Sequence, residues 1–187
     1  YTPEIAAECM EKIFLPTIHA MNAEGCPFQG CLYFGLMLTP DGPKVIEYNC
    51  RFGDPETQVV LPLLETDIMD IIEAVWEEKL DTLDIKWSDK SCACVVMASG
   101  GYPEKYETGK VISGLDENGQ CEGAFVYHAG TKLEDGKFLT AGGRVLGITA
   151  YGDTLKEALD TAYKAVDTIS FEKAHYRHDI GKKLFPL

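Results

Sequence analysis

Residues 30–56 read GCLYFGLMLTPDGPKVIEYNCRFGDPE and carry the clearest structural pattern of the chain. The apolar run 30–39 is too continuous for a strand with one face in solvent, so it predicts a buried β-strand. The Pro-Asp-Gly sequence at 40–42 predicts a tight turn, because proline and glycine suit such positions. Residues 43–50 predict a second strand, which completes an antiparallel hairpin.

The second strand carries polar side chains at every other position. Successive side chains of a strand point to opposite faces, so Glu47, Asn49 and Arg51 are expected on one side. The residues between them are expected to pack into a core on the other side: Ile46, Tyr48 and Cys50. The alternation therefore predicts one chemically active face.

These three polar side chains suit phosphoryl transfer. A carboxylate and an amide oxygen are ligands that Mg²⁺ accepts, and this ion shares its coordination with phosphates. A guanidinium one step further along can clamp a carboxylate or a phosphoryl oxygen. A structural polar face of a half-exposed hairpin stays open as the alternative. The charge-rich run 51–56 and the helix start expected after Pro55, whose free N–H groups favour an anion, support a site.

The flanking sequence predicts a mixed architecture. Apolar spacing indicates a helix from Thr2 to about Asn22 with a bend at Pro16. Two more helices are expected at 57–64 and 67–79. Short strands and a final helix with a Thr154-x-x-Glu157 capping box are expected after them, at 92–99, 110–114, 123–130, 136–140, 143–151 and 154–169.

The polar, aperiodic residues 80–91 are the best candidate for a domain boundary. We therefore predict an α+β fold: a hairpin with helices over 1–90, then a small, mostly-β domain with one packed helix over 91–187.

Composition narrows the partners. The chain has 187 residues, of which 30 are acidic and 17 basic, giving a formal charge of −13. Nucleic-acid and anionic-membrane binding rest on clustered Lys and Arg, so neither is expected. No apolar run reaches about 18 residues, and the start of the chain is not that of a signal peptide. The seven cysteines are an odd number without zinc or redox spacing, which favours reduced thiols and a cytoplasmic location.

Several motifs together resemble the glycinamide ribonucleotide synthetase family. Residues 30–64 are similar to the region that ends the ATP-grasp core of that family, and EYNCRFGDPE is its most specific part. The second half agrees in order and spacing, through VVMASGGYPEKYETGKVISG, VYHAGT, LTAGGRVLGITAYG and YRHDIG. The resemblance covers essentially the whole chain.

The resemblance implies an activity and a set of site residues. The family uses ATP to join glycine to 5-phosphoribosylamine through a glycyl phosphate, in de novo purine synthesis. It implies that Glu47 and Asn49 hold Mg²⁺ or Mn²⁺ and that Arg51 is catalytic. It also places three residues with the substrates, namely Asp54, Glu56 and Arg144.

Two departures qualify that expectation. Many ATP-grasp ligases carry another metal-binding glutamate on the preceding strand, whereas residues 31–38 hold no acid and have Phe34 near that position. This favours the glycinamide branch over a carboxylase. The chain also lacks a glycine-rich phosphate lid, paired ATP-binding lysines and a substrate domain. The resemblance thus implies an N-terminal portion as partner, without which this fragment is expected to be inactive.

Two other functions stay open at this point. The chain can belong to another ATP-grasp carboxylate–amine ligase or a carboxylase relative, or be a non-catalytic binding module that keeps the fold. Among lesser features, Asp179 is expected either to support the active centre or only to pair with Arg177. The four histidines do not have the spacing of zinc ligands.

Overall fold

The computed structural model describes residues 1–184. Contacts divide the chain into two compact units, one made of residues 1–53 and 66–85, the other of residues 54–65 and the chain from 86 onward. The chain therefore crosses between the units three times, the last time shortly before residue 90. The domain boundary near residue 90 stays a prediction. Each unit is described by itself below.

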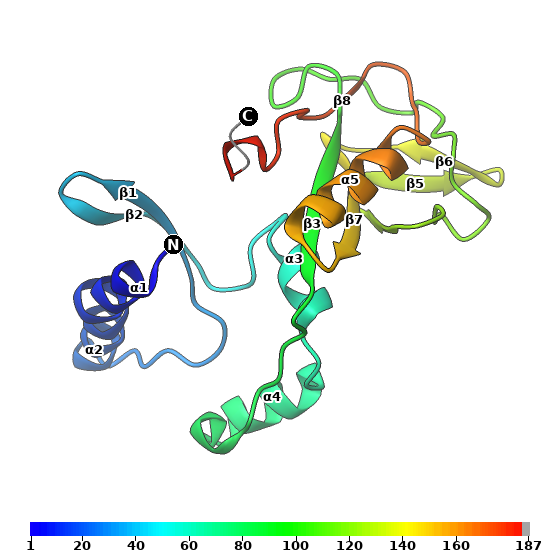
Figure 1. Ribbon diagram of the computed structural model, residues 1–187. Coiled ribbons are helices and arrows are strands. Elements are labelled where there is room, and N and C mark those ends of the chain that lie inside the picture. Colours follow the sequence, from blue (N-terminus) through cyan, green and yellow to red (C-terminus); the bar gives the residue numbers. More distant parts are fainter. Residues whose placement is uncertain (185–187) are drawn as a thin grey trace. The chain divides into compact units, whose positions relative to one another are not determined.

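The first unit contains a long helical segment, a β-hairpin and a separate helix (Figure 1). Its elements are α1 (Pro3–Cys9), a π-helical turn (Met10–Phe14), α2 (Leu15–Ala23), β1 (Tyr33–Thr39), β2 (Gly42–Asn49), α4 (Ile68–Trp76) and a 3₁₀ turn (Leu80–Thr82).

The long helical segment confirms the predicted helix and explains its irregularity. The Thr2 side chain accepts a hydrogen bond from the Ile5 N–H, as an N-cap does. The π turn lies just before Pro16, whose ring nitrogen has no hydrogen to donate. The chain widens there by one residue, and Leu15 N–H bonds to Met10 O.

The hairpin forms as predicted, with β1 antiparallel to β2. Its register places Tyr33 opposite Asn49 and shifts between Gly35 and Leu36, which makes Ile46 the extra residue of a β-bulge. The predicted burial of strand 30–39 is wrong, because Met37 and Leu38 are 53% and 50% exposed. The first half of β1 is half-buried, and Phe34 contacts Phe14 of the helical segment, whereas Met37 and Leu38 near the turn are exposed.

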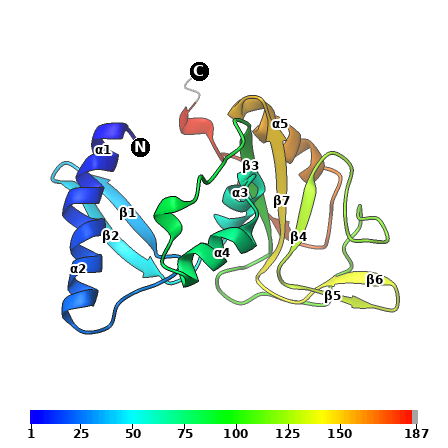
Figure 2. The same cartoon turned by 90° about the horizontal axis from the view of Figure 1, so that it is seen from below.

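The second unit is built on an antiparallel sheet. Its elements are α3 (Thr57–Val60), a 3₁₀ turn (Leu61–Leu63), β3 (Ser91–Ser99), β4 (Phe125–His128), β5 (Thr131–Glu134), β6 (Lys137–Thr140), β7 (Arg144–Gly152), α5 (Leu155–Val166), β8 (Ala174–His175) and a 3₁₀ turn (Lys182–Leu184). The sheet order is β4-β7-β3-β8, and β5 and β6 form a separate hairpin (Figure 2).

Helix α5 packs on β3 and β7 and closes the core (Figure 2). Its predicted capping box is confirmed, with the Thr154 hydroxyl and the Glu157 carboxylate each accepting a backbone N–H. Leu146 and Ile148 of β7 are fully buried in this core. Of the buried apolar residues described, all but Cys9 and Ile13 belong to the second unit. Hydrophobic burial therefore stabilises mainly that unit.

The opposite face of β7 holds the segment 54–65. The Thr149 hydroxyl donates to the Gln58 carbonyl at 3.1 Å, and the Tyr151 hydroxyl donates to the Pro62 carbonyl at 3.0 Å. This explains why a segment that follows the hairpin in sequence belongs to the second unit by contacts.

The predicted strand at 110–114 is wrong. Val111 and Ser113 make only isolated bridges, to Leu139 and Ser170. The strands β5 and β8 were not predicted, since both are short and follow glycine-rich or polar sequence. Within residues 1–184 no helix is both long and apolar enough to span a membrane.

Candidate active site

Glu47 and Asn49 point to the same side of β2, as the strand alternation predicts. The Asn49 Nδ2 atom donates to Glu47 Oε1 at 3.2 Å. Glu47 is exposed and Asn49 is half-buried, so the pair is open to a ligand. Two oxygen-bearing side chains therefore meet at the end of the hairpin.

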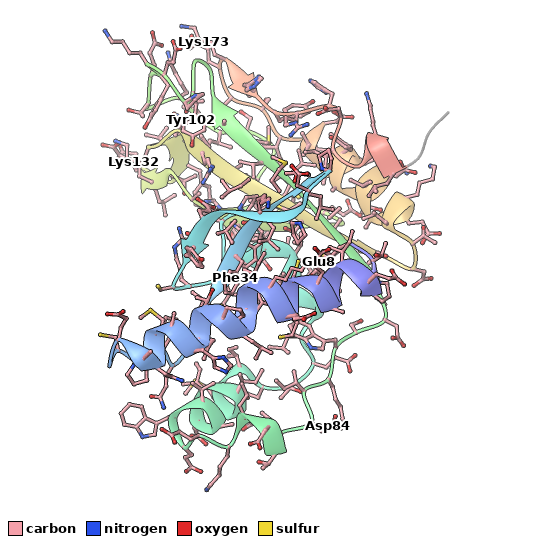
Figure 3. The ribbon with its side chains drawn as sticks, turned by 90° about the vertical axis from the view of Figure 1, so that its left-hand side faces the viewer. Glu8, Phe34, Asp84, Tyr102, Lys132 and Lys173 are labelled. Carbon is pink, nitrogen blue, oxygen red and sulfur yellow. The ribbon has the colours of Figure 1, made fainter. Side chains whose placement is uncertain are left out.

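The opposite face of β2 is apolar, although it is not a closed core. Tyr48 packs edge-on against Phe34 of β1, whose ring also contacts Phe14 at a centroid distance of 4.5 Å (Figure 3). Val45, Tyr48 and Cys50 line a groove of about 550 Å³ together with the helical segment, and Glu47 does not. The predicted core packing is wrong for all three residues: Ile46, the bulged one, is 61% exposed, Tyr48 is 52% exposed and Cys50 is exposed.

Gly35 gives Glu47 its room. It is the cross-strand partner of Glu47, and a Cβ added to it would lie 2.7 Å from Glu47 Cγ. Every larger residue would push the carboxylate aside. The sequence signal for this role is a lone glycine inside an otherwise apolar run, and it was not interpreted in that way.

The donor set at β2 fits a hard cation that also binds phosphate. Glu47 offers carboxylate oxygens, and Asn49 offers Oδ1 once its amide makes a half-turn that exchanges Nδ2 for Oδ1. Among the residues described, no group of three or more His, Cys, Asp or Glu residues is suited to a metal. Two protein ligands match Mg²⁺, which fills its remaining positions with waters and phosphate oxygens.

Arg51 follows the end of β2 and is exposed. Its Nη1 donates to the carbonyl oxygen of Phe52 at 2.8 Å. This contact uses one donor of the guanidinium and leaves the others for a ligand. The expected catalytic role of Arg51 stays a prediction.

Asp54 and Arg144, which are 90 positions apart in the sequence, lie together in the second unit. Arg144 Nη1 donates to Asp54 Oδ2 at 3.0 Å, and the two side chains are 43% and 44% exposed. Their shared exposure makes them a surface ion pair, whose contribution to stability is commonly small. Their assignment to substrate binding stays a prediction.

A β-bulge directs Arg144 toward Asp54. Ala98 of β3 pairs with Arg144 while Met97 pairs with Leu146, so Val145 is the extra residue. A bulge interrupts the alternation of a strand and can redirect a side chain. The guanidinium thereby lies 5.9 Å from the centre of the Tyr102 ring, within cation–π range.

Gly143 makes the position of Tyr102 possible. A Cβ at Gly143 would overlap the Tyr102 ring, so the ring lies directly on the glycine. The structure places this tyrosine against Arg144, a contact that sequence spacing did not reveal.

The remaining predicted residues, Glu56 and Asp179, each make local contacts. Glu56 is the N-cap residue of α3, where its backbone carbonyl accepts from Val60 N–H and its side chain makes no cap bond. Asp179 accepts two hydrogen bonds from Arg177, both at 2.9 Å. Pairing of Asp179 with Arg177 is thus confirmed.

Cys92 and Cys94 of β3 have the properties of structural rather than reactive cysteines. Burial, with Cys94 as a lesser influence, raises the pKa of Cys92 to about 11. Burial also raises the pKa of Cys94, against a hydrogen bond to Thr149 that lowers it. Thiols with raised pKa values are poor nucleophiles at neutral pH.

Two family models match the chain. Residues 1–57 match the ATP-grasp (A) domain of phosphoribosylglycinamide synthetase, and residues 92–183 match the C domain of the same enzyme. The two matched ranges account for most of the chain and agree in order with the family.

Curated relatives give the same result. The chain is 54% identical over 174 residues to a phosphoribosylamine–glycine ligase of Caldanaerobacter subterraneus, covering 93% of this chain and 41% of the relative. It is 48% identical over 186 residues to a bifunctional purine biosynthetic protein of Pichia angusta, covering 98% of this chain and 23% of that protein.

A solved structure extends the likeness to three dimensions. The crystal structure of phosphoribosylamine–glycine ligase from Thermotoga maritima matches with a TM-score of 0.77 and 34% identity, over 96% of this chain and 44% of that one. The chain thus spans about two fifths of the length of the ligases that it matches. Because its motifs, its two matched domains and its fold all agree, the chain belongs to the phosphoribosylglycinamide synthetase family.

Proposed function

We propose that this chain forms the metal-binding and substrate-binding part of an ATP-dependent carbon–nitrogen ligase. The complete enzyme would join glycine to 5-phosphoribosylamine and release ADP and phosphate. The remainder of the ligase, with its ATP-binding lysines and lid, is the proposed partner of this chain. A cytoplasmic location agrees with the reduced cysteines.

One observation supports this proposal most directly: the 3.2 Å contact of Glu47 with Asn49 on one face of β2. The pair would hold the Mg²⁺ or Mn²⁺ that accompanies ATP. When bound, this ion neutralises charge on the phosphates. Manganese and magnesium both accept such oxygen ligands.

The other site residues would act on the anions. Arg51 would use its remaining N–H groups to orient the glycine carboxylate and to stabilise the phosphoryl group during transfer. Asp54 and Arg144 would contact the second substrate, and Glu56 would join them. Catalysis in this scheme is positioning and charge neutralisation.

The test uses the complete enzyme of which this chain is proposed to be a part. Glu47→Ala and Asn49→Ala should each weaken the affinity for the metal–ATP complex and reduce glycine-stimulated ADP release at least tenfold. Lys44→Ala is the matched control, because it removes a charge from an exposed position of the same strand. Unchanged affinity and turnover in both site variants would refute the metal assignment, and glycine-independent ADP release would refute the substrate.

A further inference from the structure

Asp54 is held from two sides. Gln58 lies one helical turn after it, and Gln58 Nε2 donates to Asp54 Oδ1 at 2.8 Å. The other oxygen, Oδ2, accepts from Arg144 Nη1 at 3.0 Å. Because each carboxylate oxygen has its own donor, the carboxylate plane is fixed relative to the guanidinium.

Gln58 is itself anchored to β7. Its backbone carbonyl accepts from the hydroxyl of Thr149, a residue with no exposed surface. Its side-chain stem passes over Gly147, where an added Cβ would lie 3.7 Å from Gln58 Cγ. Gln58 thus connects Asp54 to the same strand on which Arg144 begins.

Only the Nε2 atom of the Gln58 amide makes a hydrogen bond among the residues described. Its Oε1 atom is buried and has no hydrogen-bond partner among the residues described. A buried acceptor without a partner is destabilising, so an apolar side chain of the same size would be more favourable for stability. The position therefore needs the donor end of the amide.

We propose that Gln58 is a positioning residue, which fixes the Asp54 carboxylate and through it the Arg144 guanidinium. In the described structure Arg144 Nη1 contacts Asp54, while Nε and Nη2 have no protein partner. These two groups form a fork for a substrate oxyanion, either a phosphate monoester or a carboxylate. The inference rests on the proposed function, which supplies substrates of both kinds.

The first experiment is Gln58→Met in the complete enzyme. The variant keeps the stem and removes both polar atoms, so its Tm should not fall. We expect the KM of one oxyanion substrate to rise at least tenfold, with kcat changed less than threefold. A rise for 5-phosphoribosylamine identifies the phosphate, and a rise for glycine identifies the carboxylate. If both KM values stay within twofold, the inference is wrong.

Gln120→Met is the matched control. The Gln120 amide donates to the Val126 carbonyl and accepts from the Val126 N–H, so both of its polar atoms serve the fold. This variant should lower Tm and leave both KM values within twofold. A Gln58→Met variant that behaves in the same way would reduce Gln58 to a structural residue.

Two further variants test whether Gln58 acts on the substrate through Asp54 and Arg144. In an Arg144→Ala background, Gln58→Met should have no added effect on KM. Gln58→Glu places a second carboxyl against Asp54. Its activity should recover toward that of the parent as the pH falls and the introduced carboxyl gains a proton to donate. If the effects of Gln58→Met and Arg144→Ala on KM are additive, or if the pH profile of Gln58→Glu parallels that of the parent, Gln58 does not act through Asp54 and Arg144.

A direct readout separates this inference from the proposed function. In arginine-labelled enzyme, the Arg144 Nε–H signal should be narrow in the parent and broadened in Gln58→Met, as its order is lost. An inactive parent enzyme would overturn the ligase proposal alone. An unchanged Arg144 signal in Gln58→Met would overturn the positioning role, whatever the activity.

Discussion

Gly35 lies opposite Glu47 and Gly143 precedes Arg144, and each glycine leaves space that a neighbouring side chain needs. Gly35 accommodates the Glu47 side chain, and Gly143 accommodates the Tyr102 ring next to Arg144. A Cβ atom at either glycine would displace the neighbouring side chain, Glu47 at Gly35 and Tyr102 at Gly143.

Gly35→Ala tests the first of these spaces. The added methyl would displace the Glu47 side chain by several tenths of an ångström, since 2.7 Å is too short for two carbon atoms. We expect a higher Mg²⁺ concentration for half-maximal activity in the complete enzyme, by about tenfold. Circular dichroism should show an intact fold. Unchanged metal dependence would mean that Glu47 is not a ligand.

Arg51→Lys tests the guanidinium. Lysine keeps the charge but not the planar fork, so a two-point contact with an oxyanion is lost. We expect kcat to fall at least a hundredfold in steady-state assays. A near-normal kcat would show that Arg51 serves only its contact with the Phe52 carbonyl.

The thiols provide a test by pH. Because burial raises the pKa of Cys92 to about 11, roughly a thousandth of it is thiolate at pH 8. Its alkylation by iodoacetamide, followed by mass spectrometry, should be slow at pH 8 and accelerate about tenfold per pH unit up to that pKa. The exposed Cys26 and Cys50 serve as internal references. Equal labelling of all three at pH 8 would contradict the raised pKa.

At the scale of elements, sequence pattern located the hairpin, α5 and most strands because these depend on local periodicity and turn chemistry. It also placed Glu47 and Asn49 on one face, since alternation along a strand is local. It missed both bulges, whose extra residues, Ile46 and Val145, appear only in the pairing register.

Other features could not be predicted from the sequence because they depend on tertiary contacts. The contact of Asp54 with Arg144 joins residues that only tertiary structure brings together. The full burial of strand 30–39 was wrongly predicted because an apolar run does not reveal how far a covering layer reaches: Phe34 contacts Phe14, whereas Met37 and Leu38 are exposed. Residues 110–114 have strand-like composition but pair only at isolated bridges.

The capping box of α5 offers a test at this scale. Thr154→Ala removes the acceptor of the Glu157 N–H and should lower the free energy of unfolding by about 1 kcal/mol. Thr161→Ala, within the same helix, is the control and should be neutral or slightly stabilising, because alanine is the better helix former. Chemical denaturation measures both. Equal destabilisation would indicate that the cap contributes nothing specific.

At the scale of the whole molecule, the distribution of buried residues predicts unequal stability. The core is almost entirely in the second unit, while the first exposes large apolar side chains such as Trp76, at 83%. Amides of β3, β7 and α5 should therefore exchange with deuterium far more slowly than those of β1, β2 and α4. Mass spectrometry of peptic fragments measures this. Equal protection of the hairpin and of β7 would contradict the unequal burial.

Strand β7 has two sides with different tasks. One side supplies Leu146 and Ile148 to the interior, and the other holds the segment 54–65 through Thr149 and Tyr151. A small molecule bound to Arg144, at the start of this strand, would affect the core packing on one side of β7 and the contacts to segment 54–65 on the other. Binding at Arg144 should therefore raise the melting temperature of the second unit. A thermal-shift assay can thus be used to screen for inhibitors that bind there.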